Sequence, residues 1–198
     1  MNLLSRRAAL LGFAFLLPLA ACDTPATRPT FPEIRFNQEP QIRLDVSRII
    51  VQDDYHPTFR EPFVEHLFPV PPARAAASWA HDRLVATGTP GHTARVRITD
   101  ASVRETELPK TQGVAGAFTK DQAERYDATL AIAVEILDDH GFAIRTANAQ
   151  VSRTKSVVEG ITPNDRDQVW YDMTKEMAAN LDREIEAQMR SIFGYFIQ

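Results

Sequence analysis

Histidine, acidic and hydroxyl side chains are the residues of this chain that could carry acid–base, metal or nucleophilic chemistry. The five histidines, at positions 56, 66, 81, 92 and 140, are scattered, and no HExxH spacing pairs any two of them. The densest cluster, Asp53-Asp54-Tyr55-His56, is typical of the solvated end of a strand. Ser102 and Ser156 lack a nucleophile-elbow pattern. No phosphate-binding glycine motif or calcium loop occurs. The sequence therefore predicts no enzyme activity and no metal site.

The only cysteine, Cys22, follows a segment with the composition of a secretory signal. Arg6 and Arg7 give this segment a positive charge, and Ala8 to Ala21 is an almost wholly apolar stretch. As a helix, this stretch would span about 21 Å, less than the hydrocarbon core of about 30 Å. We therefore expect residues 1–21 to be a cleaved leader. A single cysteine also excludes a disulfide framework, so the fold must depend on its hydrophobic core.

The run Leu19-Ala20-Ala21-Cys22 resembles the lipobox of bacterial lipoproteins. The resemblance implies cleavage before Cys22, a thioether-linked diacylglycerol on its sulfur, and a further acyl chain on its new amino terminus. Two or more acyl chains make attachment to a bilayer stable. The implied location is the periplasmic face of a bacterial membrane, and the covalent lipid is the only cofactor expected. Asp23 resembles the inner-membrane retention signal of enterobacterial lipoproteins, which slightly favours that membrane.

Charge and composition narrow the class of partner. Removing residues 1–21, which hold two arginines and no acid, leaves 20 basic and 26 acidic residues, a formal net charge of −6. This balance argues against nucleic acid as a partner. Residues 22–40 contain four prolines and no sustained periodicity, which indicates a tether between the lipid and the domain.

Residues 41–198 have the length and patterning of one α+β domain, with elements in the order β-α-β-β-β-α. The expected strands cover residues 41–51 with a bulge near Ser47, 94–103, 126–136 and 142–157, with a hairpin turn at 138–141. The first helix is expected from Pro72 to Thr87, with Gly88 as its C-cap. The last helix begins at Pro163 after a Thr162 cap and carries an apolar residue at every fourth position to Phe193. This order predicts a two-layer sandwich, with a four-stranded, mostly antiparallel sheet and both helices on one face.

Three segments are candidate contacts with a partner or with lipid. Residues 52–71 form a long loop that contains Tyr55, Phe59, Phe63 and Phe68. These aromatics either fold back over the core or form a docking surface, since aromatic side chains anchor interfaces. The loop at 107–124, with Val114 and Phe118, either contacts acyl chains or a partner, or is a hairpin connection that packs on the domain. The apolar C-terminus, with Phe193, Tyr195 and Phe196, packs on the domain or contacts a partner or lipid.

The assembled features resemble small envelope lipoproteins. The element order is similar to that of the LPS-assembly lipoprotein and the ABC-type transport auxiliary lipoproteins. The segment Phe118-Thr119-Lys120-Asp121-Gln122-Ala123-Glu124-Arg125-Tyr126 also resembles a family of uncharacterised lipoproteins. The resemblance implies a non-catalytic adaptor or accessory subunit of an envelope transport or assembly complex. An alternative is a carrier of lipid or amphiphile, with a deep apolar cavity lined by Leu130, Ile132, Met173 and Met177; an enzyme with a cryptic site ranks last.

Overall fold

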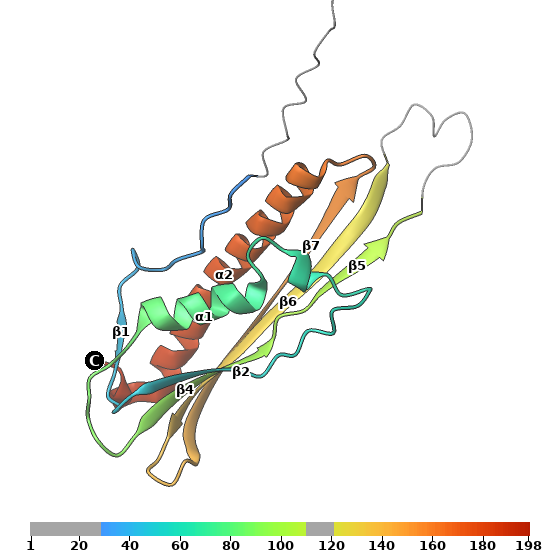
Figure 1. The fold of residues 1–198 in the computed structure, drawn as a ribbon. Coiled ribbons are helices and arrows are strands. Elements are labelled where there is room, and N and C mark those ends of the chain that lie inside the picture. Colours follow the sequence, from blue (N-terminus) through green and yellow to red (C-terminus); the bar gives the residue numbers. More distant parts are fainter. Residues whose placement is uncertain (1–28, 110–120) are drawn as a thin grey trace, which may run out of the picture.

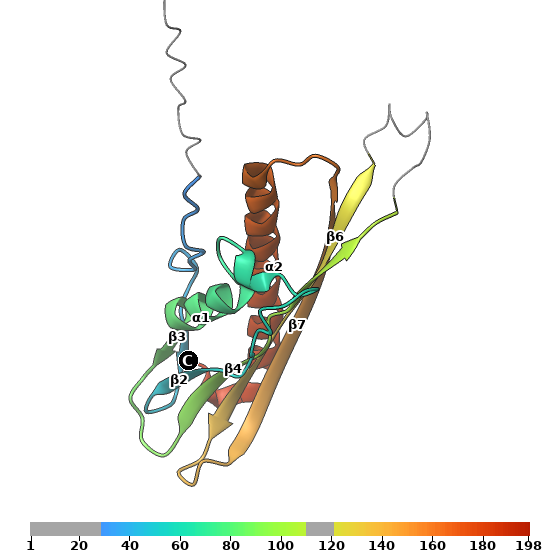
Figure 2. The same cartoon turned by 45° about the vertical axis from the view of Figure 1, so that its right-hand side comes forward.

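The computed structural model describes residues 29–109 and 121–198. Its main sheet consists of β2 (Ile49–Asp53), β4 (Thr93–Asp100), β5 (Val103–Glu107), β6 (Gln122–Leu137) and β7 (Ala143–Val158). The main helices are α1 (Pro72–Arg83) and α2 (Pro163–Phe193), and both lie on one face of this sheet (Figure 1; Figure 2). The α+β class and the single helical layer agree with the sequence prediction. Within the described ranges, no helix combines the length and apolarity needed to cross a bilayer.

The β6–β7 hairpin is the longest pairing in the sheet and follows the sequence pattern closely. Alternate residues of β6 from Tyr126 to Ile136 are buried under the helices, as their strict alternation predicts. At the turn, Asp138 Oδ1 accepts hydrogen bonds from the backbone N–H groups of His140 (3.0 Å) and Phe142 (2.8 Å). Gly141 takes a φ of 85°, a conformation that glycine adopts at little cost. The hairpin is therefore specified locally.

The expected second strand, 94–103, is two strands in the structure. β4 and β5 both pair antiparallel with β6, and the register shifts between Ile98 and Asp100. Asp100 lies opposite Ala131 and Val103 opposite Ala128, so the shifted register continues from one strand into the next. The two strands thus follow one edge of β6 as a single bulged path, which explains why the predicted sheet has four strands and the observed one has five.

The expected first strand, 41–51, is also divided, and its halves belong to different sheets. β1 (Ile42–Leu44) pairs in parallel with β3 (Leu84–Ala86), whereas β2 pairs in parallel with β4. Ser47 lies between them and donates both its backbone N–H and its hydroxyl to His92 O. The parallel arrangement of β2 and β4, with α1 as the crossover, is the one that the element order favours.

The helix predicted from Pro72 to Thr87 ends four residues early, at Arg83. Leu84 is extended because residues 84–86 pair with β1, and Gly88 donates to Val46 O instead of capping the helix. Tertiary pairing therefore overrides the local C-cap signal. By contrast, α2 begins as predicted, since Thr162 Oγ1 accepts from the backbone N–H of Asp165 at 3.2 Å.

Part of the segment assigned to the tether packs against the helices. The ring of Phe31 lies 5.1 Å from that of Tyr171, and Ile34 and Phe36 are buried in the core. Arg35 donates to both carboxylate oxygens of Asp82 on α1, at 2.8 and 2.6 Å. Residues 31–36 are therefore part of the packed structure and not of a free tether.

Candidate functional site

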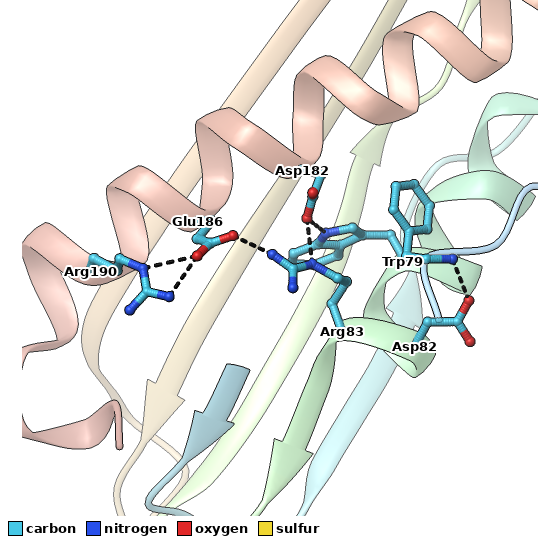
Figure 3. Close-up of polar contacts among 7 residues, drawn as sticks. Trp79, Asp82, Arg83, Asp182, Glu186 and Arg190 are labelled. Atoms are coloured by element: carbon cyan, nitrogen blue, oxygen red, sulfur yellow. Dashed lines mark hydrogen bonds and ion pairs between the residues drawn. The ribbon is translucent and has the colours of Figure 1, made fainter. Parts of the chain in front are cut away.

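The densest cluster of buried charge lies between the two helices (Figure 3). Asp182 Oδ1 on α2 accepts from Trp79 Nε1 and from Arg83 Nε on α1, both at 2.7 Å. Arg83 also pairs with Glu186, whose other oxygen accepts from Arg190 at 2.6 and 2.9 Å. The side chain of Arg83 is only 2% exposed. Because these contacts join α1 to α2 and the guanidinium of Arg83 is buried, the cluster acts as a link between the two helices.

The aromatic loop of residues 54–71 is held firmly against the edge of β5. Val64 donates its backbone N–H to Val103 O at 2.9 Å, and Glu105 donates to Pro62 O at 2.8 Å. The carboxylate of Glu65, 3% exposed, accepts from Tyr55 Oη at 2.8 Å and from Val103 N at 3.2 Å. Residues 62–64 thus occupy the hydrogen-bonding edge of β5, so the loop presents a fixed surface.

A groove lies between this loop and β5, and we call it the loop groove. Its volume is about 610 Å³. It is lined by Phe59, Glu61, Pro62, Phe63, Val64, His66, Leu67, Glu105 and Glu107. A smaller cavity of about 240 Å³ shares Phe59 and His66 with the loop groove, and the rings of these two residues are 5.3 Å apart. The two cavities are therefore neighbours.

Two large apolar side chains of the loop groove are exposed to solvent. Phe59 is 65% exposed and Leu67 is 54% exposed. Phe59 also has a φ of 54°, in the left-handed region that bulky residues rarely adopt. Such conformations persist only where the surrounding structure enforces them, and they concentrate at functional sites. This fixed presentation of an aromatic ring is what a docking surface requires.

The charged side chains of the loop groove are all acidic. Glu61, Glu105 and Glu107 line it, and none of their carboxylates forms an ion pair with a residue in the described part of the chain. Partial burial raises the pKa of the Glu105 carboxyl, and the nearby charge of Glu124 raises it further. The positive charge of Arg166 acts in the opposite direction on the pKa of Glu105, but its guanidinium donates to Glu124 at 2.8 Å. Among the described residues, the three carboxylates that line the groove therefore have no ion-pair partner, and they lie beside apolar surface.

The other sequence candidates fall into three groups. The structure corrects the assignment of Phe68 as a docking contact. Its side chain is buried, and its ring stacks on that of Trp170 with the ring centroids 4.9 Å apart, so Phe68 is a core residue. Tyr55 is half-buried and fixes the loop through Glu65, while Phe63 pairs with Arg104 across the β5 edge. Cys22, Val114 and Phe118 lie outside the described residues.

The C-terminal aromatics differ in their exposure to solvent. Phe193 and Phe196 are each 1% exposed, which corrects their assignment as contacts and agrees with packing on the domain. Phe196 O accepts from Asp45 N at 2.8 Å, and Ile197 bridges to Leu44, so the chain end extends the small β1–β3 sheet. Tyr195 alone among the three is exposed, at 73%; its neighbours Phe196 and Ile197 contact the β1 segment, and it is not among the residues that line the loop groove.

The acidic and histidine cluster at the end of β2 is tied into the sheet. Asp54 accepts from Arg97 Nε at 2.5 Å, and this hydrogen bond lowers the pKa of the Asp54 carboxyl. His56 Nδ1 lies 2.8 Å from Asp54 O. Within residues 29–109 and 121–198, no three His, Cys, Asp or Glu side chains gather as metal ligands.

The apolar cavity expected of a lipid carrier is replaced by packed core. Leu130, Ile132, Met173 and Met177 are all at most 2% exposed. They belong to the one cluster of buried side chains that joins the sheet to both helices. The sheet and α2 therefore meet directly at these positions. The described residues show no deep apolar cavity there, which is the feature that would have favoured a carrier.

Comparisons with known proteins give structural likenesses at low similarity. No family model matches the chain, and no curated protein matches it. The structural neighbours include rare lipoprotein B of Shewanella oneidensis (11% identity, 73% of this chain and 94% of that one, TM-score 0.38). They also include a minor lipoprotein of Acinetobacter baumannii (12% identity, 71% and 93%, TM-score 0.37). A Caulobacter crescentus CB15 protein assigned as a lipoprotein is similar at 14% identity (72% and 88%, TM-score 0.40). At these TM-scores, the likenesses establish neither a common fold nor a common function.

Proposed function

We propose that this chain is a lipid-anchored, non-catalytic adaptor of an envelope transport or assembly complex, attached to the membrane through Cys22. The observation that carries the adaptor role is the loop groove, where Phe59 and Leu67 are exposed on a loop that hydrogen bonds hold in place. Exposed aromatics on a preorganised surface bind partners at low entropic cost. The anchor itself rests on the lipobox-like run Leu19-Ala20-Ala21-Cys22.

The packing of residues 31–36 supports a short distance between the domain and the bilayer. Eight residues separate Cys22 from Phe31, the first residue with a ring contact on the helices. Fully extended, the nine steps from Cys22 to Phe31 reach at most about 32 Å. The chain enters the domain beside the N-terminal half of α2, so this end of the molecule would lie towards the membrane. A partner embedded in the same membrane is then within reach of the domain.

Intact mass and co-purification test the anchor and the adaptor role separately. The native product, purified in detergent from membranes, should have the mass of a chain that begins at Cys22 and carries diacylglycerol and acyl groups. A Cys22→Ser variant should lack this increment. An unacylated product, or one that keeps residues 1–21, would contradict the anchor. Absence of any stoichiometric membrane protein after affinity purification of the native product would contradict the adaptor role.

The inner-membrane location is a further part of this proposal and depends on Asp23. After density-gradient separation of the two membranes, the protein should be found with the inner membrane. An Asp23→Ser variant, with the same lipid attached, should shift to the outer membrane if this residue acts as a retention signal. Equal distribution of both variants would remove the reason for preferring the inner membrane.

A further inference from the structure

The loop groove combines apolar surface with carboxylates that have no ion-pair partner in the described part of the chain, and this combination narrows the kind of partner that the groove can bind. Phe59, Phe63, Val64 and Leu67 supply the apolar part. The three carboxylates described above supply all of the formal charge at neutral pH, because none of the nine lining residues is Lys or Arg. A neutral or acidic ligand would leave these carboxylates desolvated without compensation, which costs free energy.

We propose that the loop groove binds a cationic amphipathic segment of a partner protein, with Lys or Arg side chains facing Glu61, Glu105 and Glu107 and apolar side chains against Phe59 and Leu67. This inference deepens the adaptor function proposed above and rests on it. Charge complementarity is the physical basis, since a cation near Glu105 relieves the repulsion between this carboxylate and Glu124. The exposed face of Phe59 also suits a guanidinium or ammonium group, which an aromatic ring attracts.

The backbone arrangement favours recognition by side chains over strand addition. Residues 62–64 already hydrogen-bond to the edge of β5, so an incoming strand finds this edge occupied. The partner segment must therefore be recognised through its side chains, as an amphipathic helix is in an apolar groove. His66 adds a polar position in the groove, because its Nδ1 is buried and has no hydrogen-bond partner among the described residues.

Site-specific photo-crosslinking in the full-length chain tests the proposal. A benzophenone amino acid replaces Phe59 in the protein made by its native cells, and the adduct is identified by mass spectrometry. The expected adduct is a partner peptide with more Lys and Arg than Asp and Glu, and with apolar residues spaced by three or four. The same substitution at Tyr195, which is equally exposed but lies outside the groove, is the matched control and should not give this adduct.

Charge variants provide the second measurement. The triple variant Glu61→Gln, Glu105→Gln, Glu107→Gln should lower adduct yield about tenfold, which corresponds to about 1.4 kcal/mol shared among three charge pairs, two exposed and one, at Glu105, partly buried. The control triple Glu39→Gln, Asp139→Asn, Glu184→Gln makes the same change in net charge at exposed positions outside the groove, and it should leave the yield unchanged. Circular dichroism of both triple variants verifies that the fold is retained.

The outcomes separate failure of this inference from failure of the adaptor function. A protein adduct at Phe59 whose peptide is acidic or uncharged overturns the cationic partner and leaves the adaptor role standing. Equal loss of yield in both triple variants also overturns it, because the effect would then follow net charge alone. A lipid adduct, or no adduct at all, overturns both the cationic partner and the use of this groove by an adaptor.

Discussion

Replacing Asp182 with Ala should destabilise the fold by about 3 kcal/mol, because it removes the acceptor shared by two buried donors. Trp79 Nε1 and Arg83 Nε both donate to Asp182 Oδ1 at 2.7 Å. Breaking a buried ion pair by removing one partner costs roughly 3–5 kcal/mol. The lower end applies here because Glu186 remains to pair with Arg83. The link between α1 and α2 therefore weakens without leaving Arg83 wholly uncompensated.

Equilibrium urea unfolding of the chain from residue 22 onward measures this loss, since the core cluster of the described residues begins at Ile34. With a slope of about 2 kcal/mol per molar urea, a loss of about 3 kcal/mol moves the midpoint down by about 1.5 M. Glu184→Ala, at an exposed position two residues further along α2, is the matched control and should change stability by less than about 0.5 kcal/mol.

A double variant tests whether the unpaired charge of Arg83 causes the loss of stability. Adding Arg83→Met to Asp182→Ala removes the stranded cation, and Glu186 keeps Arg190 as its partner. The double variant should therefore recover part of the lost stability, since replacing both members of a buried pair costs less than removing one. A loss below about 1 kcal/mol in the single variant, or no recovery in the double variant, would refute the role assigned to this cluster.

Three further outcomes follow from the packing of the loop and of the N-terminal segment. Tyr55→Phe should lower the free energy of unfolding in urea by roughly 1.5–3 kcal/mol, because the hydroxyl donates to the buried Glu65 carboxylate; a change below 0.5 kcal/mol would contradict this. Hydrogen bonds from Arg35 lower the pKa of the Asp82 carboxyl below its ordinary value. The resulting stability is present above the unfolded-state pKa and is lost as pH falls through the lowered one, so Arg35→Gln should flatten the loss of stability below about pH 4. Phe36→Ala should speed tryptic cleavage after Arg35 at least about tenfold, measured by mass spectrometry, because burial of the Phe36 ring holds this segment in place; an unchanged rate would show that the segment is not held there.

Elements whose signals are local were predictable from the sequence. The alternation from Tyr126 to Ile136 identifies β6 because the side chains on one face of a strand recur every two residues. The turn at Asp138 and the cap at Thr162 were equally clear, since each depends on hydrogen bonds between residues at most four positions apart. By contrast, the split at Ser47 and the early end of α1 depend on pairing with strands far away in sequence, so a single-sequence pattern misses them.

Only part of the candidate site could be predicted from the sequence. The excess of aromatics in residues 52–71 drew attention to the loop, and Phe59 is its most exposed aromatic. Phe68 belongs to the core instead, because its ring stacks on Trp170 of α2. Glu105 and Glu107 were missed: their alternation on β5 places them on one face of that strand, but nothing in the sequence shows that this face borders the loop.

The sequence by itself determined the short-range features of this protein: its leader-like N-terminus, the lone Cys22 after a lipobox-like run, the strand alternation and the helix cap. Only the tertiary structure decided that Arg83 meets Asp182, and that Glu61 lies in one groove with Glu105 and Glu107. The physical reason is that periodicity and capping are set by neighbours within a few residues. Buried ion pairs and grooves arise when packing brings together segments that are tens of residues apart.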